Sequence, residues 1–325
     1  MLSSVAERVY WMGRYIERVE NTARLLNVYS AMLFDLPRGT DIGWNTLVDI
    51  TGINEEFSQR YSSMDEKSVV RFLLTDGGSP TSIFCGLKMV RENARTTREV
   101  IPSECWEHIN DLYHFARENV SSGVSRGRRH ELLFQIIAEC QQISGLLSDT
   151  MSHNTAYAFI NIGRKLERAD MTTRIVDVGS INLLPGMKSD HEHSERLAAY
   201  ENVIWMCILR SLSAYQAYRQ HVHNRVSGDQ VVRYLLQDSE FPRSVMFCLD
   251  QLNFYIGKLP NHENVLRAVA RVQRLSKDVK IDDLLEKGLL DFIDELQISI
   301  ADIHEELRNS WFRPAVTQQQ EQKAG

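Results

Sequence analysis

Apolar residues recur in this chain at intervals of three and four positions along almost its whole length. The clearest run, near the start, comprises Val5, Val9, Met12, Ile16, Val19, Ala23, Leu26, Ser30 and Leu33. This spacing places side chains on one face of an α-helix, whereas a half-buried strand would alternate apolar and polar residues. Alternating runs of valine, isoleucine and threonine are essentially missing. The sequence therefore predicts an all-α fold.

The helices can be placed approximately from the same periodicity. Besides the first, long helices are predicted over 79–100, 103–121, 128–150, 153–178, 190–223, 242–259 and 281–312, and shorter ones over 41–61, 65–75, 229–237 and 261–276. Ser79 can cap a helix that Pro80 opens, and Pro242 can take the same first position later in the chain. The polar end of the chain, 313–325, is predicted to be disordered.

Length and charge exclude several classes of protein. The 325 residues are enough for a substantial core, and a net charge of −6 argues against a general nucleic-acid binder. Five scattered cysteines contain no C-x-x-C pair, so they are expected to be small core residues. We expect neither a signal peptide nor a membrane span, and the protein is predicted to be cytoplasmic.

Several segments occur twice and in the same order. GRYIERVENTAR at 13–24 resembles GRKLERADMTTR at 163–174, and VVRFLLTDGGSPTSIF at 69–84 resembles VVRYLLQDSEFPRSVM at 231–246. An internally duplicated multi-helix unit is therefore predicted, with repeats of about 1–150 and 151–312. We favour one domain over 1–312 in which both halves share a bundle. Two independent domains are the alternative.

The first repeat carries a polar stripe. On a helix, Arg14, Glu17, Asn21 and Arg24 lie on one side, away from the apolar seam. Arg14 and Glu17 can pair within the helix, whereas Arg18 can reach another helix. The second copy supplies Arg164, Glu167, Arg168 and Arg174. Bracketing apolar residues indicate that the stripe lines a groove or a helix interface.

Two interpretations of this stripe remain open. Arginine suits partly buried pairing with carboxylates, so the motif can be a structural salt-bridge network that both halves inherited. Alternatively, the surplus arginines bind the carboxylate or phosphate of a ligand. The structural interpretation is favoured on the residues alone.

A second charged segment occurs once. Arg91, Arg95 and Arg98 share one helical face, and Glu92 and Asn93 flank them. Beyond a proline turn, an antiparallel helix can supply counter-charges from Glu104, Glu107 and Asn110. The matching stretch of the second half, CLDQLNFYIGKLP, has no such arginines. Because a single functional groove needs its residues only once, this segment is the better functional candidate.

Known catalytic patterns are missing from the sequence. It contains no phosphate-binding glycine loop and no nucleophile elbow with a base partner. The histidines of the His191-Glu192-His193 stretch point apart on a helix, so no metal site is predicted. No cofactor is predicted either.

Three stretches carry a resemblance to a known family: VYWMGRYIERVENTARLL at 9–26, IFCGLKMVRENARTTREVIPSECWEHIN at 83–110 and IGRKLERADMTTRIVDV at 162–178. They resemble the alpha-E domain family, all-helical bacterial proteins of uncharacterised function, over about residues 1–312. The positions that match the family motifs are Arg14, Glu17, Arg18, Arg91, Glu92, Asn93, Arg95, Glu104, Trp106, Glu107, Asn110, Arg164, Glu167, Arg168, Asp170 and Arg174.

The resemblance implies a setting for the protein. Members of this family are typically encoded beside a circularly permuted ATP-grasp protein and a transglutaminase-like peptidase. The implied function is an accessory or substrate-binding component of a system that makes or modifies peptide or amide bonds. ATP would act only through the partner.

Two other functions stay open at this point. The chain can be an enzyme in its own right, an amide ligase or hydrolase with Glu92, Glu104 or Glu107 as acid or base. It can also be a purely structural helical scaffold.

Overall fold

The computed structural model describes residues 1–35, 43–183, 202–222, 225–281, 283–284 and 288–313. Within these ranges the chain is helical and has no strand, which confirms the predicted all-α class. The predicted disordered tail begins at residue 313, and from residue 314 onward it lies outside the described residues. None of the described helices has a stretch apolar and long enough to cross a membrane.

The long helices are α1 (Ser3–Asp35), α5 (Ile83–Arg95), α6 (Ser103–Asn119), α7 (Arg126–Thr150), α8 (Thr155–Leu183), α12 (Val245–Ile256), α13 (Glu263–Asp278) and α15 (Leu289–Leu307). The shorter ones are α2 (Asn45–Thr51), α3 (Asn54–Arg60), α4 (Glu66–Thr75), α10 (Tyr215–His221) and α11 (Gly228–Gln237). A 3₁₀ turn covers Ser122–Val124, and a π-helical turn covers Arg308–Phe312.

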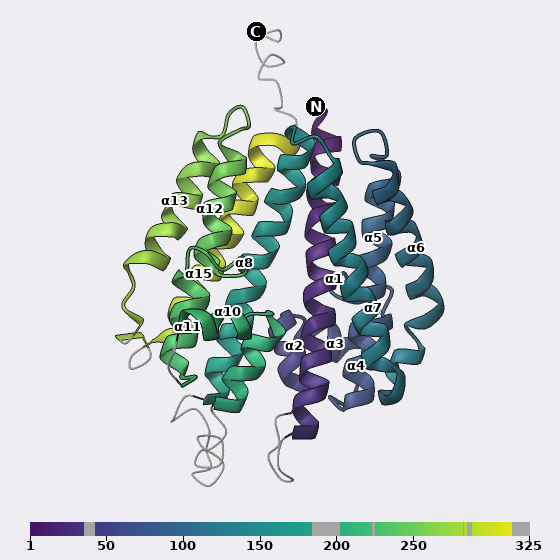
Figure 1. Ribbon diagram of the computed structural model, residues 1–325, viewed down its shortest axis with the longest axis vertical. Coiled ribbons are helices and arrows are strands. Elements are labelled where there is room, and N and C mark those ends of the chain that lie inside the picture. Colours follow the sequence, from purple (N-terminus) through teal and green to yellow (C-terminus); the bar gives the residue numbers. More distant parts are fainter. Residues whose placement is uncertain (36–42, 184–201, 223–224, 282, 285–287, 314–325) are drawn as a thin grey trace, which may run out of the picture.

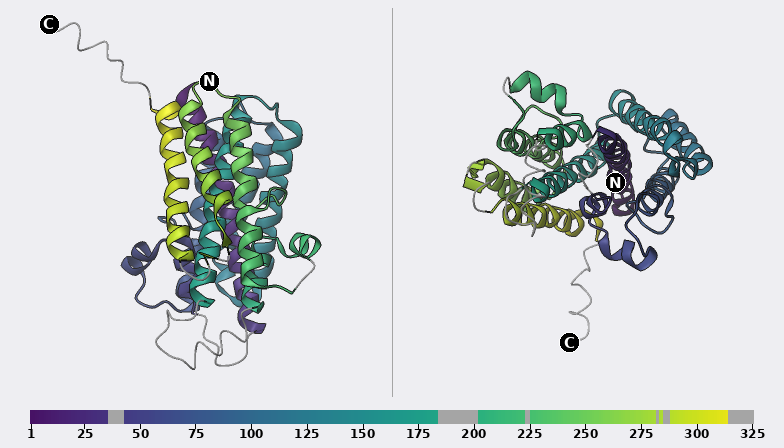
Figure 2. Two further views of the ribbon diagram at one scale, coloured as in Figure 1. Left: turned by 90° about the vertical axis from the view of Figure 1, so that its left-hand side faces the viewer. Right: turned by 90° about the horizontal axis from the view of Figure 1, so that it is seen from below.

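Two helices form the centre of the molecule. α1 and α8 lie side by side and make the most extensive contact between any two described helices (Figure 1). α1 also packs on α5 and α7, which are joined by α6, while α8 packs on α12 and α15, which are joined by α13. The end-on view in Figure 2 shows these two groups on either side of the central pair. The α1–α8 interface is therefore what holds the two groups together.

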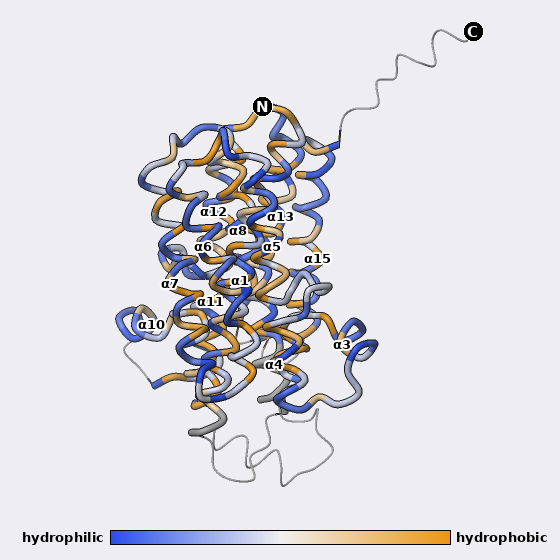
Figure 3. Tube along the Cα trace, turned by 90° about the vertical axis from the view of Figure 1, so that its right-hand side faces the viewer, coloured by the Kyte–Doolittle hydropathy of each residue, from blue (hydrophilic) through white to orange (hydrophobic). Residues whose placement is uncertain are grey.

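The predicted apolar seam of the first helix is buried. Val9, Met12, Ile16, Val19 and Ala23 are each 1% exposed or less. Hydrophobic and hydrophilic stretches recur along each long helix, as the tube in Figure 3 shows. Burying one stripe of each helix is the main source of stability in such a bundle.

Several predicted helix ranges are wrong for local reasons. The predicted helix 190–223 is interrupted, within its described part, at residues 212–214, where Ser213 has φ of 54°. The range 41–61 contains two helices, because Gly52 adopts a left-handed conformation with φ of 69° and ends α2. The predicted helix 79–100 begins later, since Ser82 rather than Ser79 accepts a hydrogen bond from the backbone N–H three residues on. Ser244 caps α12 in the same way. In both places the cap follows the proline by two residues.

Candidate functional site

The backbones of α1 and α8 approach each other closely at two glycines. A Cβ atom on Gly13 would lie 2.3 Å from the carbonyl oxygen of Ile160, and one on Gly163 would lie 2.2 Å from that of Tyr10. Any side chain here would collide with backbone, which cannot move aside cheaply. These glycines therefore allow the two helices to approach closely enough for the polar side chains that follow to interact across the interface.

The carboxylate of Glu167, on α8, accepts hydrogen bonds from two arginines of α1. Arg14 donates from Nε to Oε2 at 2.7 Å, and Arg18 donates from Nε to Oε1 at 2.5 Å and from Nη2 to Oε2 at 3.0 Å. The Glu167 side chain is 2% exposed. Both oxygens of a buried carboxylate are thus satisfied by charge-assisted hydrogen bonds.

Glu17 of α1 has the reciprocal environment. Arg168 donates from Nε and Nη2 to its two oxygens at 2.6 and 2.7 Å, and Arg164 lies at 3.7 Å. Arg243, which precedes α12, adds a third contact at 3.2 Å. The Glu17 side chain is completely buried. One carboxylate therefore holds guanidinium groups from two other segments.

The pairing across the interface corrects part of the sequence prediction. Arg14 pairs with Glu167 and not with Glu17 of its own helix. The prediction that Arg18 reaches another helix is confirmed. Glu167 accepts hydrogen bonds from both Arg14 and Arg18, whereas Glu17 accepts them from Arg168 and has the matching Arg164 only at 3.7 Å, beyond hydrogen-bond distance. The duplication itself stays a prediction.

The stripe continues one turn further along α1. Arg243 donates to Asn21 Oδ1 at 2.6 Å and to Glu20 Oε1 at 2.7 Å. Arg24 donates to Glu20 at 2.9 Å and to the Ser213 hydroxyl at 2.8 Å. The predicted stripe residues on α1 therefore also anchor segments of the second half.

The second copy repeats one of these intrahelical pairs. Arg174 donates to Asp170 on the same helix at 3.0 Å, at the i and i+4 spacing that Arg24 and Glu20 also have. The Arg24 and Glu20 side chains are 13% and 3% exposed, and those of Arg174 and Asp170 are 32% and 20% exposed. Pairs at this spacing add modestly to helix stability.

Arg243 was not predicted as a site residue. It stands in the second repeat where the first has Thr81, directly before the capping Ser244. The signal available in the sequence was this replacement of threonine by arginine in an otherwise similar segment. Its partners could not be deduced, because they lie more than 220 residues away in the chain.

The pKa values of the two carboxylates show how strongly the arginines stabilise their ionised forms. Burial opposes ionisation of Glu167, but Arg18 and Arg14 outweigh it and lower its pKa to about 2. Burial also opposes ionisation of Glu17, yet Arg168 and Arg243 hold its pKa well below the usual range. Both carboxylates are therefore ionised at neutral pH and act as permanent counter-charges. This arrangement does not suit proton transfer near neutral pH.

The structural interpretation of the E-R stripe accounts for these contacts. The pairs of Glu17 and Glu167 lie across the α1–α8 interface, whereas Arg24 and Arg174 pair with carboxylates of their own helices. The ligand-binding role of Arg14, Glu17, Arg18, Arg24, Arg164, Glu167, Arg168 and Arg174 stays a prediction. Removing one member of a buried ion pair leaves the other uncompensated, which is strongly destabilising. The network therefore fixes the register of α1 against α8.

A tyrosine and a histidine extend the network toward α15. The Tyr10 oxygen lies 3.2 Å from Arg14 Nη1 and 2.8 Å from His304 Nδ1. Because the guanidinium can only donate, the tyrosine oxygen accepts from Arg14 and can donate its own hydrogen to a neutral His304. This contact ties the last long helix to the central pair.

Acidification is expected to destabilise the protein through His304. Burial, together with the charge of Arg14, lowers the pKa of His304 from 6.5 to about 4. Between these values the unfolded chain binds a proton that the folded chain does not, so the free energy of unfolding falls as the pH drops. We expect the wild-type protein to lose more stability between pH 7 and pH 4.5 than His304→Gln, measured by urea denaturation. Equal losses would contradict this assignment.

The 91–110 segment lies on α5, α6 and the turn between them. Arg91 donates to Asn110 Oδ1 at 2.8 Å, and its guanidinium lies 5.0 Å from the ring centre of Tyr113 and 5.8 Å from that of Trp106. Arg98 lies 4.9 Å from the same Trp106 ring. The antiparallel helix thus supplies an amide and aromatic faces.

The predicted carboxylates behave differently from the expectation. Glu92 pairs with Arg95 one turn away on the same helix at 2.7 Å, and both side chains are 53% exposed. Glu104 and Glu107 are exposed on α6 and form no ion pair with the arginines among the described residues. The prediction that they supply counter-charges is wrong, because they do not face α5 in this hairpin.

Asn93 has a partly buried side chain. Its Nδ2 is buried and has no hydrogen-bond partner within the described ranges, while its carbonyl accepts from the Thr96 and Thr97 hydroxyls. These bonds accompany the end of α5 before the turn. The residue supports the helix end, and a ligand role for it stays a prediction.

One carboxylate with a raised pKa was missed. Burial and the nearby charge of Asp294 raise the pKa of Asp177, on α8, to about 6. No motif marks this position in the sequence. None of the three cavities described for this structure is lined by Asp177.

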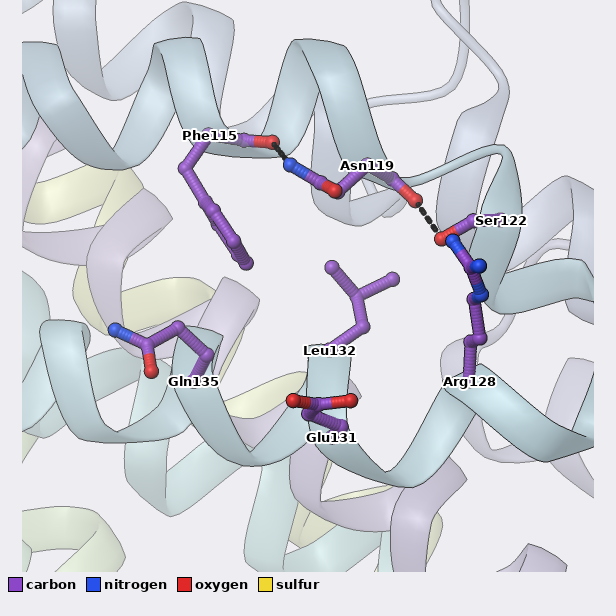
Figure 4. Close-up of a pocket in the computed structure, with 7 residues that line it drawn as sticks. All are labelled: Phe115, Asn119, Ser122, Arg128, Glu131, Leu132 and Gln135. Atoms are coloured by element: carbon purple, nitrogen blue, oxygen red, sulfur yellow. Dashed lines mark hydrogen bonds between the residues drawn. The ribbon is translucent and has the colours of Figure 1, made fainter.

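None of the predicted site residues lines one of the three cavities described for this structure. One of about 230 Å³ lies between α6 and α7, lined by Phe115, Asn119, Ser122, Arg128, Glu131, Leu132 and Gln135 (Figure 4). Its Asn119 donates to the Phe115 carbonyl, and its Ser122 donates to the Asn119 carbonyl. Two further cavities flank α11. In the part of the chain that the structure describes, no group of His, Cys, Asp or Glu is arranged to hold a metal ion.

Fold and interface define an all-α protein whose two central helices are held together by reciprocal Arg–Glu pairs. The Alpha-E family model, for "a predicted alpha-helical domain with a conserved ER motif", matches residues 1–312. The chain therefore belongs to the Alpha-E family. Glu-Arg pairs stand at 17–18 and at 167–168, in the middle of the interface.

The curated relatives are longer proteins. Uncharacterized proteins of Mycobacterium bovis and Mycobacterium tuberculosis are each 24% identical to this chain over 329 residues. The match covers 94% of this chain and 36% of each relative. The chain thus spans little more than a third of their length. No solved structure matches significantly.

Proposed function

We propose that this chain is a non-catalytic, substrate- or partner-binding component of a cytoplasmic ATP-grasp-linked system that makes or modifies peptide or amide bonds. The observation that carries this proposal is the pair of guanidinium groups of Arg91 and Arg98 on the α5–α6 face. Neither has a carboxylate partner among the described residues, and both are held against aromatic rings.

This face suits an anionic group of a peptide or protein. Stacking on Trp106 restricts both guanidinium groups without neutralising their charge. A guanidinium that is fixed in orientation can donate two parallel hydrogen bonds to a carboxylate. The ligand class proposed is therefore a peptide carboxylate, or an acidic side chain of the ATP-grasp partner.

The carboxylates on this face favour binding over catalysis. Hydrogen bonding to Arg95 lowers the pKa of Glu92, whereas a general acid near neutral pH needs a raised one. Glu104 and Glu107 stand in solvent. The chemistry and the ATP site are accordingly assigned to the partner, and the transglutaminase-like peptidase is a further candidate for the same system.

The greater length of the relatives supports a function in which this chain acts together with further protein segments. In them, the matching segment is joined to nearly twice its own length of additional chain. We expect this chain likewise to act beside further protein, whether joined to it or separate.

Binding of the ATP-grasp partner is expected to weaken when Arg91 or Arg98, neither of which has a carboxylate partner among the described residues, is replaced. Arg91→Gln and Arg98→Gln should each lower the affinity about tenfold, since a hydrogen bond to a charged group contributes about 1.5–3 kcal/mol. The measurement is calorimetry with the separately purified partner, and a peptide with a free carboxylate serves as the second ligand.

Arg95→Gln is the matched control, because this arginine is exposed on the same helix but already paired with Glu92. Its affinity should stay within about twofold of wild type, as expected for a weak surface pair. Failure of the two proteins to copurify, or equal effects of all three substitutions, would count against the proposal.

A further inference from the structure

Two aspartates build the same turn at the C-terminal ends of α4 and α11. The side chain of each accepts from the backbone N–H groups two and three residues later, at 2.8 and 3.1 Å for Asp76 and at 2.9 and 2.6 Å for Asp238. The backbone carbonyl of each also accepts from a capping serine, Ser82 in one turn and Ser244 in the other. The two turns are therefore directly comparable.

The first turn contains a guanidinium from the chain itself. Arg60, the last residue of α3, donates from Nη1 to Asp76 Oδ1 at 2.5 Å. The offset that aligns the two turns aligns Arg60 with Val222, which directly follows α10. The second turn thus has an aliphatic side chain where the first has a cation.

The second carboxylate accepts two backbone hydrogen bonds but has no permanent cation beside it among the described residues. The Asp238 side chain is only 7% exposed, and its Oδ2 lies 3.6 Å from His221 Nε2. No arginine or lysine forms an ion pair with Asp238 within the described ranges. A buried carboxylate without a permanent cation is costly, which favours a ligand that supplies one.

A cavity lies beside this carboxylate. About 310 Å³ in volume, it has Asp238 and Glu240 as its two carboxylates, and it has no arginine or lysine in its wall. Tyr234 and Phe241, whose rings stack at 5.1 Å, supply aromatic surface. A neighbouring cavity of about 370 Å³ also borders Asp238 and has Arg233 in its wall.

We propose that the 310 Å³ cavity binds the guanidinium group of an arginine side chain from a peptide or protein partner. The bound group would compensate the charge of Asp238 as Arg60 compensates that of Asp76, but through Oδ2 rather than Oδ1. It would donate to Oδ2, which accepts no hydrogen bond from the described residues, and would lie against Tyr234 and Phe241. This site is on α10–α11 and is separate from the α5–α6 face.

The test compares two small ligands of nearly equal shape, N-acetyl-arginine amide and the neutral N-acetyl-citrulline amide. Binding to the full chain is followed by NMR titration or calorimetry. The arginine compound should bind at least about tenfold more tightly, because only it carries the charge that Asp238 and Glu240 compensate. Equal affinities would overturn the proposal, and so would tighter binding of N-acetyl-lysine amide.

Two variants locate the site. Asp238→Asn keeps an oxygen for the turn but removes the charge, and it should weaken binding of the arginine compound about tenfold. Val222→Arg leaves Asp238 intact and supplies a competing guanidinium from the position that matches Arg60, so it should abolish measurable binding. Arg308→Gln, in the turn that follows α15 and outside both proposed sites, should bind the compound like wild type. Unchanged binding in Val222→Arg would overturn the assignment even if Asp238→Asn fails to fold.

Discussion

Replacing Glu17 with glutamine is expected to lower the free energy of unfolding by about 3–5 kcal/mol. The substitution preserves the size of the side chain but removes the negative charge that faces Arg164, Arg168 and Arg243. Arginine cannot lose its proton to relieve the resulting repulsion. Chemical denaturation of the purified variant, monitored by circular dichroism, measures the loss.

Glu92→Gln is the matched control. It also removes one Arg–Glu pair, but both side chains are 53% exposed, so the cost should stay below about 1 kcal/mol. Adding Arg168→Met to Glu17→Gln should recover part of the stability, because it removes one uncompensated buried charge. Similar small losses in Glu17→Gln and Glu92→Gln would show that the α1–α8 network is not a structural lock.

Gly13→Ala is expected to cost about 3 kcal/mol, the upper part of the usual range for overpacking. The added methyl group would lie 2.3 Å from the Ile160 carbonyl oxygen, so α1 and α8 must separate. Separation would also lengthen the hydrogen bonds to Glu167, which are 2.5 to 3.0 Å long. Thermal and urea denaturation measure the loss of stability.

Gly145→Ala provides the opposite expectation. This glycine is exposed within α7, and a Cβ atom there would meet nothing within 4 Å. Alanine should therefore stabilise the helix by about 1 kcal/mol through its higher helix propensity. A neutral or stabilising effect of Gly13→Ala would contradict the close helix contact.

Local patterns in the sequence were sufficient for much of the fold. The spacing of residues such as Val9, Met12 and Ile16 predicted a buried helical face, because periodicity alone determines which side chains share a face. Helix ends were predicted less well. Ser79 and Ser82 both suit an N-cap, and the choice depends on how the turn before α5 packs.

The same division between local patterns and long-range packing applies to the candidate site. The sequence indicated that Arg14, Glu17 and Arg18 form an ordered charged stripe, and that Arg91 and Arg98 share a face. It could not indicate that Glu17 pairs with Arg168, since an intrahelical partner for Glu17 was equally available by spacing.

The sequence by itself determined that this chain is all-α, that its apolar faces are buried and that two similar E-R helices exist in it. Only the tertiary structure decided that these helices exchange their partners across α1 and α8, and that Arg243 joins them. The physical reason is that helical periodicity is a local property of the backbone. The partner of a buried charge is instead set by the distance and direction between segments that are far apart in the chain.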